Sequence, residues 1–143
     1  MRVQFIRTHE NAVLPSKGSA LAAGHDLYAA EACLVPARSR VLVNTGWRVC
    51  VQPGYELQVR ARSGLAVKHG IGVLNSPGTV DEDYRGSLGV ILVNTTDFDF
   101  EIAPGDRVAQ MVVKPVVYAH VVEVEKFELP SERGEDGYGS TGR

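Results

Sequence analysis

Short segments in which apolar and polar residues alternate with a period of two dominate the hydrophobic pattern of this chain. Residues 47–51 and 55–60 alternate in this way, and residues 97–102 place Phe, Phe and Ile opposite Asp, Asp and Glu. Successive side chains of a β-strand point to opposite faces, so strict alternation is typical of a strand with one buried face. Each of these three segments is therefore predicted to be a half-buried strand.

Longer apolar runs predict further strands. Residues 41–43, 90–93, 108–113 and 116–124 are rich in β-branched residues and are bounded by Gly, Pro or Asn, which suits strands buried on both faces. Turn signals recur about every ten residues, at Pro53-Gly54, Ser63-Gly64, Pro77-Gly78, Arg85-Gly86 and Pro104-Gly105. This spacing favours an all-β barrel or double-sheet roll over alternating βαβ units.

Helical signals are minimal. Only residues 63–69 are suited to a helical turn or two, with Ser63 as the expected N-cap. We expect a single β domain over residues 1–130 and a flexible, glycine-rich tail over residues 131–143. The tail holds four glycines and a single large apolar residue, Tyr138, so it cannot bury enough surface to fold by itself. Its residue types fit either a frayed end or a phosphate-gripping loop with an aromatic stacking platform.

Composition narrows the function classes. The 143 residues contain 15 Lys and Arg against 17 Asp and Glu, a net charge of −2, which argues against a protein that coats nucleic acid. No apolar run approaches the roughly 20 residues that cross a bilayer, and the N-terminus lacks a signal-peptide pattern. We therefore expect a cytoplasmic protein with neither nucleic acid nor membrane as partner. Cys33 and Cys50 form no disulfide framework and are predicted to be free, buried thiols.

Five patches concentrate glycine, carboxylate, arginine and hydroxyl residues. In the first, Asp26 lies among alanines and fits either a turn cap or an oxygen ligand of Mg²⁺. In the second, Arg62 and Ser63 precede a glycine at the start of the expected helix. Exposed amides, a hydroxyl and a guanidinium are good phosphate donors, although a solvated Arg and an ordinary N-cap would give the same pattern.

The other three patches lie further along the chain. Residues 81–85 read Asp-Glu-Asp-Tyr-Arg between glycines, a pattern that fits a solvated turn or a general base beside a phosphate. The fourth patch contains Asp106 and Arg107, interpreted as structural partners, and Gln110, whose role is ambiguous. The fifth is the tail. Zinc, nucleophile-elbow and P-loop signatures are missing, so the remaining chemistry is a metal-assisted attack of water on a phosphoryl group.

Taken in order, AGHDLYAA, ARSGLAVKHGI, GTVDEDYRG, PGDRVAQ and RGEDGYGSTG closely resemble the five motifs of the trimeric dUTPases, over about residues 22–142. Ala61 stands where that family usually has Pro, and Tyr138 where it most often has Phe; neither change removes a functional group. The resemblance implies a jelly-roll-like β-barrel of the β-clip type that forms a homotrimer with shared active sites. It also implies hydrolysis of dUTP to dUMP and pyrophosphate with Mg²⁺, which keeps uracil out of DNA and supplies dUMP for dTMP synthesis.

The resemblance also assigns roles to single residues. Asp81 corresponds to the general base that activates water for attack on the α-phosphorus, and Tyr84 to the residue whose ring excludes a 2′-hydroxyl. Asp26 corresponds to the carboxylate that holds Mg²⁺ through water, the metal being chelated mainly by the triphosphate. The positions around uracil match Asn75, Gly78 and Gly89. The phosphate-binding positions match Arg62, Ser63, Gly64 and Gln110. The tail residues that would clamp the γ-phosphate and stack on uracil match Arg133, Tyr138, Gly139, Ser140 and Thr141.

Two other functions stay open. A dCTP deaminase-related enzyme shares the fold, but the tail and the Asp81 and Tyr84 pair favour the hydrolase. A nucleotide-sensing regulatory protein on the same fold would be favoured by loss of Asp81 or of the tail, and both are present.

Overall fold

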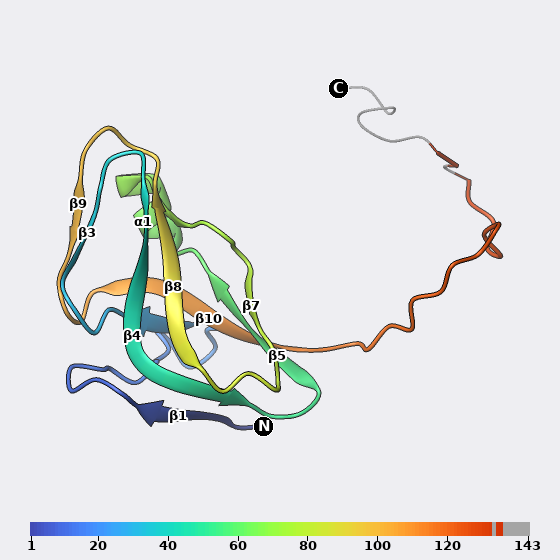
Figure 1. Ribbon diagram of the computed structural model, residues 1–143, viewed down its shortest axis with the longest axis horizontal. Helices are drawn as coiled ribbons and strands as arrows, with labels where there is room; N and C mark the ends of the chain where they lie inside the picture. The colour runs from blue at the N-terminus through green and yellow to red at the C-terminus, as the bar shows by residue number, and fades with distance from the viewer. Residues whose placement is uncertain (133, 136–143) are drawn as a thin grey trace.

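The computed structural model describes residues 1–132, 134 and 135, and within them ten strands and one short helix (Figure 1). The helix is α1 (Ser63–His69). The strands are β1 (Val3–Arg7), β2 (His25–Tyr28), β3 (Cys33–Val35), β4 (Arg40–Val51), β5 (Tyr55–Arg60), β6 (Ile71–Val73), β7 (Gly78–Val80), β8 (Ser87–Asn94), β9 (Phe100–Ile102) and β10 (Arg107–Pro115). The prediction of an all-β protein with minimal helix is thus confirmed.

The strands form three sheets in which every pair is antiparallel. The first sheet has the order β1-β4-β8-β6 and the second β2-β10-β5-β7, while β3 and β9 form a two-stranded sheet. β4 and β8 run side by side as the longest pair of the first sheet (Figure 1). None of these described sheets closes on itself. The described chain thus has two four-stranded sheets around one core and no closed barrel, and the jelly-roll connection stays a prediction.

The core lies between the two larger sheets. The most deeply buried large side chains come from both of them and from the short strands beside them: Leu27, Val35, Val43, Leu57, Ile71, Leu88 and Leu92. Facing sheets bury one side of each strand, so residues on the inner faces alternate with outer ones. The described chain accordingly buries every second residue of β8.

Three of the apolar runs behave differently from the prediction of strands buried on both faces. In residues 90–93 burial alternates, and in 41–43 the middle residue, Leu42, is 68% exposed, because no described residue covers this part of the outer face of the first sheet. Residues 116–124 form no strand and are largely exposed. β10 has β2 and β5 on its two sides, and the chain that follows Pro115 pairs with no described strand and runs away from the sheets (Figure 1).

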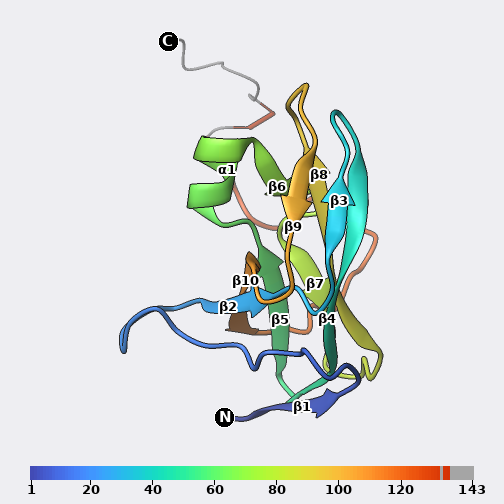
Figure 2. The ribbon, with the colours of Figure 1, turned by 90° about the vertical axis from the view of Figure 1, so that its left-hand side faces the viewer.

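The helix α1 begins where the sequence predicts but is capped differently. Arg62, in an extended conformation, holds the N-cap position without a side-chain cap, so the expectation that Ser63 is the N-cap is wrong. The helix ends at Gly70, whose left-handed conformation suits glycine and lets its N–H return to the Ala66 carbonyl. Figure 2 shows α1 lying beside β6. No described residue of α1 is buried.

A bulge in β4 fixes how the first sheet meets the N-terminal segment. The pairing of β4 with β8 shifts register between Asn44 and Arg48, and Gly46 within this interval has a φ of 75°. A Cβ at Gly46 would lie 2.7 Å from the Cβ of Ala12, so this approach requires glycine as well as the left-handed backbone. The buried Thr45 donates its hydroxyl to the Leu88 carbonyl at 2.5 Å.

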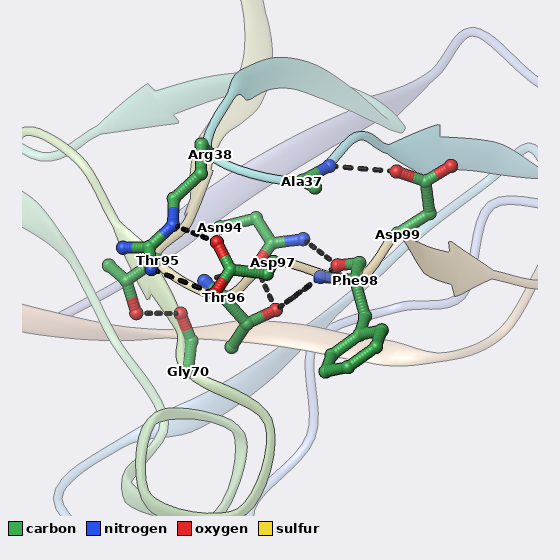
Figure 3. A network of polar contacts seen from close by, with 9 residues as sticks. All are labelled: Ala37, Arg38, Gly70, Asn94, Thr95, Thr96, Asp97, Phe98 and Asp99. Atoms are coloured by element: carbon green, nitrogen blue, oxygen red, sulfur yellow. Dashed lines mark hydrogen bonds and ion pairs between the residues drawn. The ribbon is translucent and has the colours of Figure 1, made fainter.

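The turn between β8 and β9 is organised around one buried amide (Figure 3). Asn94, 1% exposed, donates its amide to the carbonyls of Val35 and Phe98 and accepts from the N–H of Thr96. On the surface, Asp97 of this turn pairs at 2.7 Å with Arg38, which lies between β3 and β4. The segment predicted as strand 97–102 is therefore a strand only from Phe100, because the preceding residues follow these turn bonds and leave Phe98 exposed.

Trp47 links the N-terminal strand to the first sheet. Its indole N–H donates to the Val13 carbonyl at 2.9 Å, and its ring meets Phe5 edge-on and carries the Arg7 guanidinium 4.7 Å from its centre. Hydrogen bond, aromatic and cation–π contacts together hold residues 3–13 against β4.

Both cysteines are free but only half-buried, so the prediction of buried thiols is wrong in degree. Cys33 lies at the edge of the core, where burial and the nearby Glu31 raise the pKa of its thiol. In the part of the chain that the structure describes, no helix is long and apolar enough to cross a membrane.

Candidate functional site

One cleft of about 550 Å³ gathers five of the residues singled out from the sequence. They lie on β7, on β8 and on the segments that flank β7: Asn75, Gly78, Asp81, Tyr84 and Gly89. The apolar wall comes from β4 and β5, with Leu42, Val43 and Val59, and equally from β7 and β8. The cleft has the size and the mainly apolar lining with a few polar groups that small-molecule sites usually have.

Glycines bring the backbone of the cleft close to its side chains. A Cβ at Gly78 would lie 2.9 Å from the Asn75 amide nitrogen, and a Cβ at Gly89 would lie 2.7 Å from Leu42 Cδ1. Only glycine lets these neighbours lie where they do, because real Cβ atoms do not approach so closely. The Asn75 and Leu42 side chains therefore pack directly against the glycine backbone at these positions.

Tyr84 lies at the margin of the cleft with its ring held in place. Its hydroxyl donates to the Ser87 carbonyl at 2.9 Å, and a Cβ at Gly86 would overlap the ring and hydroxyl. The side chain is 42% exposed. The ring thus combines a fixed position with a face available to a ligand.

The loop between β7 and β8 separates its three acidic residues. Asp81 lines the cleft, whereas Glu82 accepts a hydrogen bond from the Gly54 N–H at 2.6 Å, in the turn before β5. The loop is closed internally by Arg85, whose guanidinium donates to the carbonyls of Glu82 and Tyr84. Asp83 is exposed. Within the run of acids, only Asp81 is positioned to act on a molecule in the cleft.

A second group of predicted residues meets at the ends of β2, β5 and β10. Asp26 Oδ1 accepts from Arg62 Nε at 3.0 Å, and its Oδ2 lies 3.5 Å from Arg107 Nη1. The Asp26 side chain is 17% exposed. Arg62 also donates to the Arg107 carbonyl at 3.0 Å. Hydrogen bonds of this kind between charged groups hold both arginines in fixed positions.

Gln110 belongs to the same group. It pairs in register with Asp26 on one side and Arg60 on the other, and its amide donates to the Ala61 carbonyl at 2.9 Å. A Cβ at Gly24 would overlap its carbonyl oxygen. The structure therefore brings together Asp26, Arg62 and Gln110, with Arg107 as a fourth member.

Ser63 and Gly64 begin α1 directly after Arg62, and both are exposed. A smaller cavity of about 230 Å³ beside them is lined by Arg62 and Arg107 together with Leu65, Phe100, Ile102, Asp106 and Val108. It shares no lining residue with the larger cleft. We call Asp26, Arg62, Arg107 and Gln110 the arginine–carboxylate group. On a single chain, this group and the cleft are therefore two separate features.

The tail residues predicted to bind phosphate and base, Arg133, Tyr138, Gly139, Ser140 and Thr141, lie outside the described residues.

The metal prediction rests on one carboxylate. In residues 1–132, 134 and 135 no three His, Cys, Asp or Glu side chains come together as metal ligands. Both Asp26 oxygens already face arginines, and the pKa of the neighbouring His25 is lowered by burial and by Lys17. Mg²⁺ commonly keeps several waters and binds through one or two carboxylates plus substrate phosphates. A single carboxylate therefore fits an Mg²⁺ ion that is bound to the nucleotide and contacts Asp26 through water. It does not fit an ion held by protein side chains alone.

Sequence reasoning missed one residue of the cleft and one of the loop beside it, and it misjudged a third residue. Leu42 and Glu82 carry no signal in the sequence, because an apolar strand residue and the middle of an acidic run have many ordinary uses. Arg107 was interpreted as a structural partner of Asp106. Asp106 instead accepts from the Ala103 N–H in its own turn, and Arg107 reaches Asp26.

Comparisons with known proteins agree on one family. The model of the dUTPase family matches residues 10–142. The deoxyuridine 5′-triphosphate nucleotidohydrolase of Wolinella succinogenes is 50% identical over 143 residues, covering all of this chain and 95% of the relative. That of Oryza sativa subsp. japonica is 51% identical over 133 residues, covering 93% of this chain and 76% of the relative. Among solved structures, a Staphylococcus bacteriophage 80alpha dUTPase with dUpNHpp has a TM-score of 0.92 at 27% identity, over 99% of both chains.

Proposed function

The chain belongs to the dUTPase family and is an enzyme that hydrolyses dUTP, and we propose that it does so with Asp81 as general base and with Mg²⁺ on the nucleotide. The observation that carries this proposal is the gathering of Asp81 and Tyr84 with Asn75, Gly78 and Gly89 around one cleft. A nucleoside in that cleft would have a carboxylate at one end and glycine backbone at the other.

Asp81 accepts a proton from a water molecule as that water attacks the α-phosphorus. The new bond joins the water oxygen to phosphorus, the bond to the bridging oxygen breaks, and pyrophosphate leaves while dUMP remains. A well-placed general base contributes roughly 10² to 10⁴ in rate. The position of Asp81 in the cleft, apart from the neighbouring acids, supports this role.

Selection of dUTP follows from the shape of the same cleft. Uracil presents a carbonyl where cytosine presents an amino group, so a backbone donor matched to uracil would stay unpaired with cytosine. Thymine differs by a methyl group, which backbone packed closely at Gly78 and Gly89 would exclude. The Tyr84 ring, held through its hydroxyl, would pack on the deoxyribose and leave no room for a 2′-hydroxyl.

The arginine–carboxylate group would bind the triphosphate. Arg62, Ser63, Gly64 and Gln110 offer a guanidinium, a hydroxyl, backbone amides and a side-chain amide, all of them donors to phosphate oxygens. Bound Mg²⁺ would neutralise charge on the triphosphate as the leaving group departs. Asp26 would hold the waters of that ion, and its longer contact, with Arg107 at 3.5 Å, is the one that would yield.

We further propose a homotrimer with shared sites, in a jelly-roll arrangement. The separation of the cleft from the arginine–carboxylate group on one chain supports sharing, since a complete site then needs a second copy. Exposed apolar side chains after β10 support association too: Val117, Val121, Phe127 and Leu129 are each more than 80% exposed. The tail residues Arg133, Tyr138, Gly139, Ser140 and Thr141 would close over nucleotide held by a neighbouring subunit. A cytoplasmic location stays a prediction.

A dCTP deaminase or a purely regulatory protein is less well supported. The named relatives are nucleotidohydrolases, and the carboxylate and tyrosine of the hydrolase motif lie together in the cleft.

A competition assay tests the proposal. The purified protein is mixed with Mg²⁺ and equimolar dUTP, dCTP, dTTP and UTP, and all products are resolved by chromatography. Loss of dUTP alone, with dUMP and pyrophosphate appearing and chelation of Mg²⁺ stopping the reaction, is expected. Conversion of dCTP would support the deaminase, and turnover that continues in excess chelator would overturn the role of Mg²⁺.

A further inference from the structure

Glu82 belongs to the loop between β7 and β8, which also carries Asp81. The side chain of Glu82 points away from the cleft. One of its carboxylate oxygens, Oε2, accepts a hydrogen bond from the Gly54 N–H at 2.6 Å and another from the Tyr118 hydroxyl. Tyr118 lies three residues beyond the end of β10. The loop that carries Asp81 is thereby joined to two segments that are distant in the sequence, the turn between β4 and β5 and the start of the chain that follows the last strand.

The same turn holds the chain after β10 a second time. The Val116 N–H donates to the Gly54 carbonyl at 3.0 Å. The peptide groups of Gly54 thus face Glu82 with the N–H and Val116 with the carbonyl. We call residues 116–132 the C-terminal arm. Gly54, Glu82, Val116 and Tyr118 form a junction at the base of this arm.

Asp81 depends on its neighbours for its position. On its N-terminal side the chain is fixed by β7, where Val80 pairs with Leu57. On its C-terminal side the first side-chain anchor is Glu82. Among the described residues, the Asp81 carboxylate itself has no hydrogen-bond or ion-pair partner, and its carbonyl accepts only from the Tyr84 N–H at 3.2 Å. Movement of Glu82 would therefore move Asp81 through the peptide they share.

The protonation states favour the junction at neutral pH. The Tyr118 hydroxyl and the Gly54 amide lower the pKa of Glu82, and the bond to Glu82 raises the pKa of Tyr118. The carboxylate is then ionised and the phenol protonated, which is the combination that gives a charge-assisted hydrogen bond.

We propose that Glu82 is a positioning residue for Asp81 and that the Tyr118 hydroxyl makes this positioning depend on where the C-terminal arm starts. The inference rests on the proposed function, because it takes Asp81 as the general base. Neither Glu82 nor Tyr118 lines the cleft, so both act on the chemical step and not on nucleotide binding. Small misplacements of reacting groups cost up to about 10²-fold in rate, and two surface-accessible bonds account for a fraction of that.

Steady-state kinetics with dUTP on the full chain tests the proposal. Tyr118→Phe removes one bond to Glu82, Glu82→Ala removes both, and Glu82→Gln keeps an uncharged acceptor. We expect kcat to fall about threefold in Tyr118→Phe and about tenfold in Glu82→Ala, with Glu82→Gln between them and KM within about twofold of the original in all three. Tyr55→Phe and Asp83→Asn are the matched controls, a tyrosine beside Gly54 and an acid beside Glu82, and both should leave kcat unchanged.

A double variant separates a shared bond from two independent effects. If Tyr118 acts through Glu82, Glu82→Ala with Tyr118→Phe is no slower than Glu82→Ala alone. Multiplication of the two losses would overturn the role of Tyr118, and an unchanged kcat in Glu82→Ala would overturn the whole inference. Asp81→Asn is measured in the same assay. If Asp81→Asn keeps full turnover, the assignment of Asp81 as general base fails. If Asp81→Asn loses turnover while Glu82→Ala keeps it, Asp81 remains the base and only the positioning role of Glu82 is refuted.

Discussion

The cleft and the arginine–carboxylate group are built from different kinds of chemical group. The cleft is walled by strand backbone, glycines and aliphatic side chains, with Asp81 and Tyr84 at its margin. The arginine–carboxylate group consists of long side chains that hold one another, with Asp26 between Arg62 and Arg107. The first can reject a ligand by shape, because close-packed backbone yields little. The second would attract the charged triphosphate and would not distinguish between bases.

The two regions would therefore have different tasks in the proposed reaction. Variants of the cleft should alter turnover or the choice among nucleotides. Variants of the arginine–carboxylate group should alter the concentration of triphosphate required, equally for every nucleotide. A variant that crosses this division would show that the two regions are not separate in function.

The largest effect is expected from Asp81→Asn. The amide cannot accept the proton from water, so kcat for dUTP should fall about 10²- to 10⁴-fold, while binding of a non-hydrolysable dUTP analogue changes little. Single-turnover rates and calorimetric titration measure the two quantities. Weakened analogue binding together with near-normal turnover would assign Asp81 to binding instead of chemistry.

Arg62→Ala is the corresponding change in the arginine–carboxylate group. Hydrogen bonds to charged groups contribute about 1.5–3 kcal/mol, so KM for dUTP should rise about 10- to 100-fold. The ratio of dUTP to UTP turnover should stay the same, and the effect should shrink at high salt because screening weakens what remains of the attraction. Arg40→Ala, an exposed arginine on the other large sheet, is the control. A changed ratio of dUTP to UTP turnover in Arg62→Ala would show that this group also contributes to the choice of nucleotide.

Gly86→Ala should change selectivity with little effect on affinity. The added methyl would overlap the Tyr84 ring and hydroxyl, so the ring must leave the position where it would exclude a 2′-hydroxyl. Discrimination between dUTP and UTP should fall about tenfold, the scale of a single methylene in a pocket. Gly18→Ala, where a Cβ meets nothing within 4 Å, is the control, and kcat/KM for both nucleotides is the measurement. Unchanged discrimination would mean that the Tyr84 ring position does not set it.

The smallest effect concerns the junction at the base of the arm and appears as a pH dependence of stability. The pKa of Glu82 is lowered from its ordinary value of 4.5, so its stabilisation is full above that pH and is lost as pH falls through the lowered value. The pKa of Tyr118 is raised from 10.0, so its contribution is lost as pH rises through the raised value. The difference in Tm between the original chain and Glu82→Gln should therefore be greatest between about pH 5 and 9. A difference that does not shrink as the pH falls below 4.5 would contradict the bond as its source.

Local sequence patterns predicted much of the secondary structure. Alternation predicted the strands around residues 47–51 and 55–60, and β-branched composition predicted the strand around 108–113, because these segments pack against a core of their own chain. Residues 116–124 have the same composition as a core strand, yet no edge receives them. Composition gives the tendency of a segment to form a strand but not the presence of a partner.

The candidate sites were predictable to the extent that motifs mark them. Five residues of the cleft were predicted from the resemblance to the family, and the structure gathers them from β7, β8 and the flanking segments. The cap at Arg62 instead of Ser63, the contact of Arg107 with Asp26 and the outward turn of Glu82 could not be predicted. Each depends on which way a side chain points once distant segments meet, and the sequence pattern of one segment carries no information on that.

Trp47 gives the chain a built-in optical probe. It is the single tryptophan of the sequence, 6% exposed, and its indole is bonded to Val13 and stacked under Arg7. Because Trp47 is not among the residues that line the cleft, its fluorescence should shift to the red when residues 3–13 undock and should stay unchanged when dUTP is added. Emission spectra during denaturation and during nucleotide titration would therefore follow loosening of the N-terminal strand separately from occupancy of the cleft.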